Sequence, residues 1–217
     1  LSQDERELGV VLVDIGGGTT DIAVFSAGSI VHTSVLAVGG NHLTNDIAIG
    51  LSTPLAEAEM LKHQYGVAMS SLVEPGEMIK VPSVGGRRSR TLEKRVLAEV
   101  IEPRFREIFE MVNKEIDKSG YRHLIASGAV ITGGSSLMPG AEDLASEILQ
   151  FPVQLGLPNN VTGLDEMVCS PMHATGVGLL RYALGSGENR IVPLFSGEQT
   201  VLHKMSRRMR EWVNEFF

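Results

Sequence analysis

A short glycine-rich segment near the amino end constrains the fold of this chain more than any other stretch. Residues 10–22 read VVLVDIGGGTTDI, so a run of branched apolar residues ends in Asp14 and is soon followed by three glycines. Branched residues favour a buried strand. Gly16, Gly17 and Gly18 let the backbone turn tightly and direct its N–H groups at an anion without Cβ atoms in the way. The segment therefore predicts a strand followed by a turn that binds phosphate.

The polar residues around this turn indicate a more specific ligand. Thr19 and Thr20 add hydroxyl donors, while Asp14 and Asp21 place an acid on each side of the turn. An acid beside a phosphate is repulsive unless a divalent cation lies between them, and the carboxylate then ligates Mg²⁺ or its waters. The pattern predicts a nucleoside triphosphate with magnesium, although three glycines alone would more often form a hairpin.

A second glycine turn follows much later in the chain. Residues 128–132 are expected to form a short apolar strand, residues 133–136 read GGSS, and a helix is predicted over residues 141–149 after Pro139 and Gly140. A strand, paired glycines and a helix let the backbone approach a flat or charged ligand closely. Taken alone, an ordinary strand-to-helix turn explains this segment equally well.

Periodicity predicts the other elements. The first seven residues form a polar lead-in, and short turns join three strands into a meander that Gly39 and Gly40 close. Helical spacing and turn residues then predict a hairpin with a basic tip and several helices, one of them disturbed by Pro103. The predicted ranges are strands at 10–14, 21–25, 30–38, 79–84, 90–95 and 153–157, and helices at 41–51, 53–65, 96–119 and 171–184.

Composition excludes several classes of protein. The net charge of −7 gives no reason to expect nucleic acid as a partner. The single cysteine, Cys169, rules out an internal disulfide and is expected to be a buried small apolar residue. The six histidines lack ligand spacing, so none is assigned to a metal site. No stretch has the length of a membrane span and the amino end has no signal-peptide pattern, while the first residue, Leu1, suggests a fragment.

The carboxyl end has a different character. Residues 185–201 lack helical periodicity and are predicted to be a linker. Residues 202–217 are predicted to form an amphipathic helix that lies in a membrane interface, where each cation contributes about 1 kcal/mol near anionic lipid. Its apolar face comprises Leu202, Met205, Met209, Trp212, Val213 and Phe216, and its basic face Lys204, Arg207, Arg208 and Arg210. The alternative is a last helix docked on the domain.

Together these motifs resemble a known superfamily. DIGGGTTDI from Asp14 resembles the second phosphate motif of the actin, Hsp70 and sugar-kinase ATPases, and ITGGSSLMPG from Ile131 resembles their adenosine motif, in the same order and at a similar separation. Within that superfamily the whole chain resembles the FtsA family of bacterial cell-division proteins. The supporting stretches are VGGNHLTNDIA, AEAEMLKHQYG, VPSVGGRRSR, LAEVIEPR and the basic amphipathic end.

The resemblance implies an α/β fold: an actin-like (ribonuclease H-like) nucleotide-binding subdomain, residues 1–47 and 122–184, with a small α/β subdomain inserted at residues 48–121. It implies ATP binding, self-association into filaments, and a peripheral position at the division site on the cytoplasmic face of the inner membrane. Other divisome proteins and the carboxyl-terminal tail of the tubulin-like FtsZ are the implied partners. The chain resembles only the second half of the family, without the first phosphate loop, so at most weak ATPase activity is expected.

The resemblance also assigns roles to residues. Asp14 would hold Mg²⁺ through water, Asp21 would help to position water, and the glycines of residues 16–18 with Thr19 and Thr20 would donate to the phosphates. Gly133, Gly134 and Ser135 would line the adenosine, Met138 would lie near the base, and Glu59 and Lys62 would contact ribose or adenine. Without the family, Glu59 and Lys62 read as a solvated helix face.

A partner site is implied on the inserted subdomain. Its basic hairpin would hold the carboxylates of the FtsZ tail, through Arg87, Arg88, Arg90, Lys94 and Arg95. An arginine-rich hairpin is otherwise typical of a solvated sheet edge.

Three alternatives remain from the sequence. A small-metabolite kinase of the same ATPase fold would need a substrate site in the cleft and has no use for a cationic amphipathic end. Another actin-like scaffold, of the cell-shape or pilus-assembly kind, would differ in its partner. A chaperone of the Hsp70 type is less compatible, because only a linker and one helix follow the ATPase core.

Overall fold

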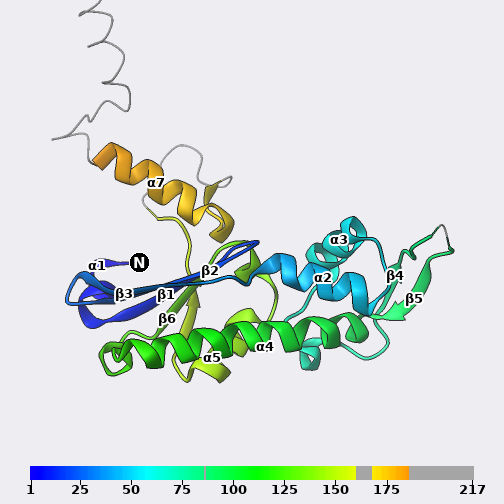
Figure 1. Ribbon diagram of the computed structural model, residues 1–217, viewed down its shortest axis with the longest axis horizontal. Helices are drawn as coiled ribbons and strands as arrows, with labels where there is room; N and C mark the ends of the chain where they lie inside the picture. Colours follow the sequence, from blue (N-terminus) through cyan, green and yellow to red (C-terminus); the bar gives the residue numbers. More distant parts are fainter. Residues whose placement is uncertain (86, 160–167, 186–217) are drawn as a thin grey trace, which may run out of the picture. The chain divides into compact units, whose positions relative to one another are not determined.

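A five-stranded mixed sheet is the centre of the computed structural model, which describes residues 1–85, 87–159 and 168–185 (Figure 1). Its strand order is β3-β2-β1-β6-β7, with β1 to β3 antiparallel and β6 and β7 parallel to β1. The strands are β1 (Val10–Ile15), β2 (Thr20–Ser26), β3 (Ser29–Leu36), β6 (Ala129–Thr132) and β7 (Val153–Leu155). The mixed α/β class and the predicted meander are confirmed.

The meander follows from its turn residues and its burial pattern. Ala27 and Gly28 both have positive φ, 48° and 77°, as a two-residue hairpin turn requires. Val10, Val11 and Val13 in β1 are fully buried. β1 is the central strand of the sheet, and its Val11 and Val13 belong to the core that includes helix residues. Its carboxyl end leads into the first glycine turn.

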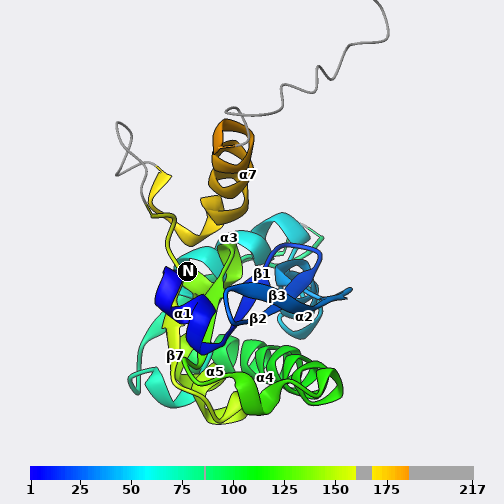
Figure 2. The same cartoon turned by 90° about the vertical axis from the view of Figure 1, so that its left-hand side faces the viewer.

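The long helix α4 (Lys94–Ser119) runs along the sheet and continues past α2 (Gly40–Gly50), as Figures 1 and 2 show. It is continuous through Pro103, begins two residues before the predicted start, and ends at Gly120 in the left-handed conformation (φ 75°). Phe105 and Phe109 lie at its buried centre with ring centroids 5.8 Å apart. Helix α4 thus forms one continuous core with the sheet and α2.

Two further helices and a hairpin complete the surroundings of the site. Helix α3 (Leu55–Tyr65) packs on α2, and α5 (Ala141–Leu149) packs on α4 with the predicted bounds. The predicted hairpin is β4 (Met78–Val81) paired with β5 (Arg90–Glu93) in a separate two-stranded sheet. Arg104 of α4 forms an ion pair with both carboxylate oxygens of Asp46, at 2.6 and 3.2 Å, which ties α4 to α2.

Several expectations were wrong in detail. The first residues are not a plain lead-in, because Ser2 and Glu5 form a capping box that starts α1 (Gln3–Leu8). The predicted helix from Pro171 begins as a 3₁₀ turn, η4 (Pro171–His173), before α7 (Ala174–Gly185). Cys169 is exposed, not buried, and its thiol lies 3.7 Å from the Pro158 carbonyl oxygen. Three other 3₁₀ turns are η1 (Ser70–Leu72), η2 (Arg122–Leu124) and η3 (Gly134–Leu137).

Residues Leu1–Val177 form one compact unit, and the described residues from Gly178 belong to another. The division into an actin-like subdomain and an inserted one at residues 48–121 stays a prediction. Residues 186–201 of the predicted linker and the predicted helix at 202–217 lie outside the described residues. Among the helices that are described, none combines the length and apolar character needed to span a membrane.

Candidate functional site

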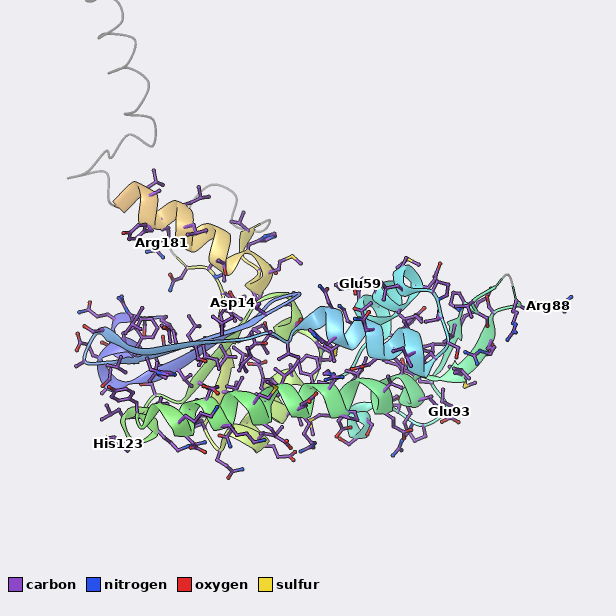
Figure 3. The ribbon with its side chains drawn as sticks, viewed as in Figure 1. Asp14, Glu59, Arg88, Glu93, His123 and Arg181 are labelled. Atoms are coloured by element: carbon purple, nitrogen blue, oxygen red, sulfur yellow. The ribbon has the colours of Figure 1, made fainter. Side chains whose placement is uncertain are left out.

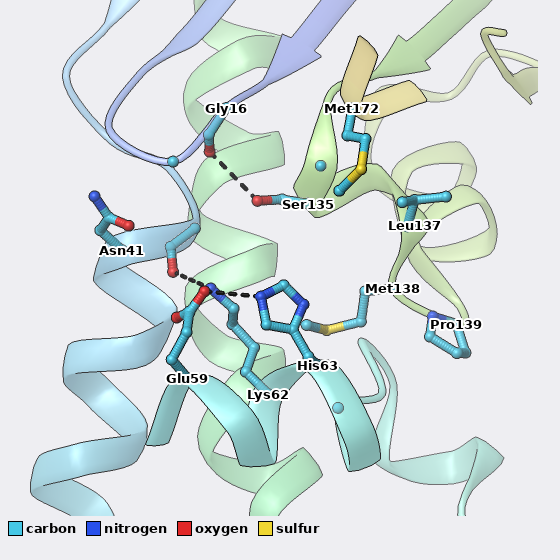
Figure 4. A pocket seen from close by; sticks show the side chains of 14 residues that line it. Gly16, Asn41, Glu59, Lys62, His63, Ser135, Leu137, Met138, Pro139 and Met172 are labelled. Atoms are coloured by element: carbon cyan, nitrogen blue, oxygen red, sulfur yellow. Dashed lines mark hydrogen bonds and ion pairs between the residues drawn. The ribbon is translucent and has the colours of Figure 1, made fainter. Parts of the chain in front are cut away.

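A cavity of about 300 Å³ lies where the two glycine turns meet (Figure 4). The first turn follows β1, the second is η3 after β6, and α2 and α3 supply the other walls. Of the residues predicted from the sequence, it brings together Gly16, Gly17, Glu59, Lys62, Gly134, Ser135 and Met138. It is also lined by Gly40, Asn41, His63, Gly66, Leu137, Pro139 and Met172.

Hydrogen bonds to the carbonyls of the first turn hold the cavity together. The Ser135 hydroxyl donates to the Gly16 carbonyl oxygen at 3.3 Å. The N–H groups of Gly40 and Asn41 donate to the carbonyls of Gly16 and Gly17 at 2.9 and 2.7 Å. A Cβ at Gly40 would lie 2.6 Å from the Ser135 hydroxyl oxygen. The start of α2 is therefore a third component of the site, and it needs glycine for close packing.

Packing requires glycine at some positions of the two turns and not at others. Gly133 has φ +87°, and a Cβ there would lie 2.4 Å from Asp14 Oδ1 and 2.5 Å from the Ile15 carbonyl oxygen, so this glycine is required by packing. A Cβ at Gly18 would meet no atom within 4 Å, and one at Gly134 would only reach Met172 Cβ at 3.9 Å. Packing within the protein does not explain the absence of side chains at Gly18 and Gly134.

A charged network forms the wall on α3. Lys62 Nζ lies 2.8 Å from Glu59 Oε2, 2.9 Å from the Thr44 hydroxyl and 3.1 Å from the Gly40 carbonyl oxygen, with only 9% of its side chain exposed. The second Glu59 oxygen contacts His63 Nε2 at 2.9 Å. Burial opposes ionisation of Glu59, but hydrogen bonds from Lys62 and Thr44 and the nearby positive charges outweigh it and lower its pKa. Glu59 is thus a carboxylate at neutral pH.

The two predicted acids are direct cross-strand neighbours. Asp14 and Asp21 are paired residues in the β1–β2 register, and opposite residues of antiparallel strands project on the same face. Each carboxylate accepts a hydrogen bond from a threonine: Asp14 Oδ2 from Thr175 at 2.5 Å, and Asp21 Oδ2 from Thr19 at 3.0 Å. Neither acid lines the cavity itself.

Thr20 has a different place from Thr19. Thr20 is fully buried and its hydroxyl donates to the Val38 carbonyl oxygen at 2.8 Å. Because this hydroxyl already donates inside the fold, we do not assign it to the phosphates. Thr19 is exposed beside the turn. Within the described ranges, no group of three or more His, Cys, Asp or Glu side chains is arranged to hold a metal ion.

The basic hairpin lies away from the cavity; Figure 3 labels Arg88 there, Glu59 on α3 and Asp14 at the end of β1. Three of the five predicted cations have internal partners: Arg90 of β5 donates to the Leu51 carbonyl, and at the start of α4 Lys94 pairs with Glu77 at 2.9 Å and Arg95 with Glu99 at 3.2 Å. Arg87 and Arg88 at the tip are exposed. These two offer the more accessible charge.

Sequence reasoning did not assign several lining residues. His63 lies one helical turn after Glu59, a spacing that was visible in the sequence. Gly40 belongs to the glycine pair that was interpreted only as the end of the meander, and Asn41 follows it. Met172 comes from a distant segment with no local motif, and only the tertiary fold places it in the cavity.

The fold and the paired glycine turns place the chain in the class of actin-like proteins. MreB5 of Spiroplasma citri, solved with AMPPNP, superimposes with a TM-score of 0.61 at 21% identity, covering 86% of this chain and 56% of that one. At this identity the likeness establishes the actin-like fold alone.

Sequence comparison then identifies the family. A family described as cell division protein FtsA matches residues 11–178. Cell division protein FtsA of Pseudomonas aeruginosa is 48% identical over 221 residues, covering all of this chain and 53% of its own length, and that of Escherichia coli K12 is 41% identical, covering 98% and 51%. The chain belongs to the FtsA family. It spans about half the length of these relatives.

Proposed function

We propose that the cavity binds ATP with Mg²⁺ and that the nucleotide controls assembly of a cell-division protein. The observation that carries the proposal is that the two glycine turns, 119 residues apart in sequence at Gly16 and Ser135, line one cavity. Family membership supports the division role over that of a metabolite kinase or a chaperone. Nucleotide acts here as a conformational ligand more than a substrate, because no acceptor site for phosphoryl transfer can be identified from the sequence.

The phosphates would lie against the first turn. Gly17 and Gly18 are exposed, and Gly18 has open space around it, so backbone donors there are accessible to an anion. Asp14 and Asp21, opposed across β1 and β2, destabilise the sheet by mutual repulsion unless a cation compensates them. Asp14 would hold a hydrated magnesium ion, whose positive charge would supply that compensation.

The adenosine would lie against the second turn and α3. Leu137, Met138 and Met172 provide apolar surface for a base, and Gly134 leaves room for its approach. On the opposite wall Glu59 supplies a hydrogen-bond acceptor for ribose or base, and Lys62 would donate to the ligand in exchange for one of its bonds to Glu59, Thr44 and the Gly40 carbonyl. This chemistry suits a flat ring with polar substituents.

Photoaffinity labelling tests the site. The full-length protein is irradiated with Mg²⁺ and 8-azido-ATP, and labelled peptides are mapped by mass spectrometry. Label on residues 62–66 or 134–139, competed by unlabelled ATP, is expected. If the label that unlabelled ATP competes away maps only to other residues, the assignment is refuted.

We also propose that the basic hairpin of the inserted subdomain (residues 48–121) binds the FtsZ tail. We further propose that nucleotide-bound molecules form filaments. Charge reversal at Arg87 and Arg88 removes the two exposed cations of the tip. This double variant should weaken binding of an FtsZ tail peptide at least about tenfold if the carboxylates pair there. Reversal of exposed Lys114 on α4 is the matched control, and equal affinities of the two variants would exclude the hairpin.

Membrane attachment is proposed from residues 202–217, which lie outside the described residues. Replacement of Trp212 by Glu should release the protein from anionic liposomes in co-sedimentation, because a charge would enter the apolar face. Replacement of Arg208 by Glu should weaken binding mainly at low salt. Undiminished sedimentation of the Trp212 variant would place the attachment, and with it the peripheral position at the inner membrane, in another part of the protein.

A further inference from the structure

We infer that Thr175 is a positioning residue that orients Asp14 toward the magnesium–phosphate group. The inference rests on the proposed nucleotide site and adds to it a residue that no sequence motif assigned. Thr175 lies 161 residues after Asp14 and donates its hydroxyl hydrogen to Asp14 Oδ2 at 2.5 Å. Through this contact the start of α7 reaches Asp14, the acid that precedes the first glycine turn.

The Asp14 carboxylate has a hydrogen-bond donor at one oxygen and a closely packed glycine at the other. Oδ2 accepts from Thr175, while Oδ1 lies so close to Gly133 that a Cβ there would be 2.4 Å away. These two neighbours restrict the rotation of the side chain. A carboxylate held in this way presents its remaining lone pairs in a fixed direction.

The segment that carries Thr175 contacts the second glycine turn as well as Asp14. The Pro171 carbonyl oxygen accepts hydrogen bonds from the Gly133 N–H at 3.2 Å and from the Thr132 hydroxyl at 3.4 Å. Met172 lines the cavity beside Gly134. Residues 171–175 thus join Asp14, near the end of β1, to the turn after β6, and we expect a ligand held between the turns to lie near Met172.

The chemistry favours positioning over stability as the role of this bond. Carboxylates that ligate metals are usually hydrogen-bonded by outer-shell partners, and loss of such a partner lowers metal affinity by about 10- to 100-fold. Thr175 is exposed, so water can replace its hydroxyl at Asp14 when the side chain is removed. Loss of the Thr175 hydroxyl should therefore leave the fold stable but change the orientation of Asp14.

The test measures the Mg²⁺ concentration that half-saturates its effect on binding of a fluorescent ATP analogue by the full-length protein. Thr175→Val removes the hydroxyl at nearly constant volume, and Thr175→Ser restores it. The same Thr-to-Val change at exposed Thr33 on β3 is the control. We expect the half-saturating Mg²⁺ concentration to rise about 10-fold or more in Thr175→Val, and to stay near the unaltered value in Thr175→Ser and in the control.

A double-mutant cycle separates an effect on Asp14 from a general effect on the protein. In an Asp14→Asn background the Thr175→Val change should cause no further shift in the Mg²⁺ requirement, because both changes act through one carboxylate. If Thr175→Val does not fold, as judged by its melting temperature in EDTA, Thr175→Ala is compared with Thr175→Ser in its place.

The outcomes are distinguishable. Analogue binding with an unchanged Mg²⁺ requirement in Thr175→Val would overturn the inference and leave the nucleotide site standing. A shift that persists in the Asp14→Asn background would also overturn it. Absence of competable analogue binding by the unaltered protein would overturn the nucleotide site and the inference together.

Discussion

Ser135 donates a hydrogen bond to the carbonyl oxygen of Gly16 at 3.3 Å, across 119 residues of sequence. This bond joins the turn after β1 to the turn after β6, and the cavity lies beside it. Because β1 and β6 are adjacent parallel strands, their carboxyl ends meet at one edge of the sheet. The site is therefore a consequence of the strand order.

Neighbouring glycines of the second turn should respond differently to substitution. Gly134→Val should lower ATP affinity by at least about tenfold, since a side chain would enter the space proposed for the ligand, while the melting temperature changes little because a Cβ there meets nothing closer than 3.9 Å. Gly133→Ala should instead destabilise the fold, because its Cβ would clash with Asp14 and Ile15 at positive φ. Calorimetry of binding and unfolding measures both, and a reversed pattern would contradict this account of the turn.

Lys62 should stabilise the wall of the cavity. Lys62→Met keeps the aliphatic stem but removes one donor each from Glu59 and from the Gly40 carbonyl, so the free energy of unfolding should fall by about 1–3 kcal/mol. Urea denaturation measures this change. The same substitution at exposed Lys114 is the control, and equal effects at the two positions would show that the network contributes nothing.

Glu102 should make stability depend on pH. The Ser70 N–H, 2.8 Å from its carboxylate, is the largest cause of a lowered pKa, and Arg106 adds to it. A folded-state pKa below the unfolded value gives stability that is present above the ordinary glutamate pKa of about 4.3 and is lost as pH falls through the folded value.

The Glu102→Gln variant should therefore be less stable than the unaltered protein at pH 7, by less than about 1 kcal/mol for so accessible a pair, and the gap should close in acid. Unfolding midpoints from pH 3 to 7 give the test, with exposed Glu110→Gln on the same helix as the control. A gap that widens in acid would have the wrong sign.

The ion pair between α4 and α2 should be sensitive to side-chain geometry. Arg104 contacts both oxygens of Asp46, which a lysine cannot reproduce. Arg104→Lys should lower the free energy of unfolding by about 1–2 kcal/mol. A double-mutant cycle with Asp46→Asn isolates the pair, and a coupling energy near zero would show that the contact does not stabilise α2.

Local patterns determined which elements could be predicted. The helix at Ala141–Leu149 and the strand before Gly16 were predictable because periodicity and turn residues act over a few positions. Thr20 was assigned to the phosphates because it follows the glycines, but it begins β2, where its side chain is buried and donates to the Val38 carbonyl oxygen, while Thr19 precedes the strand and is exposed. The contact of Thr175 with Asp14 has no local signal, since it depends on how segments 161 residues apart come together.

The most direct test of the account is a structure of the full-length protein crystallised with Mg²⁺ and AMPPNP. We expect phosphates at Gly16–Gly18, the base between Met138 and α3, and the metal beside Asp14. Nucleotide bound on a surface that Gly17 and Gly134 do not share would contradict it.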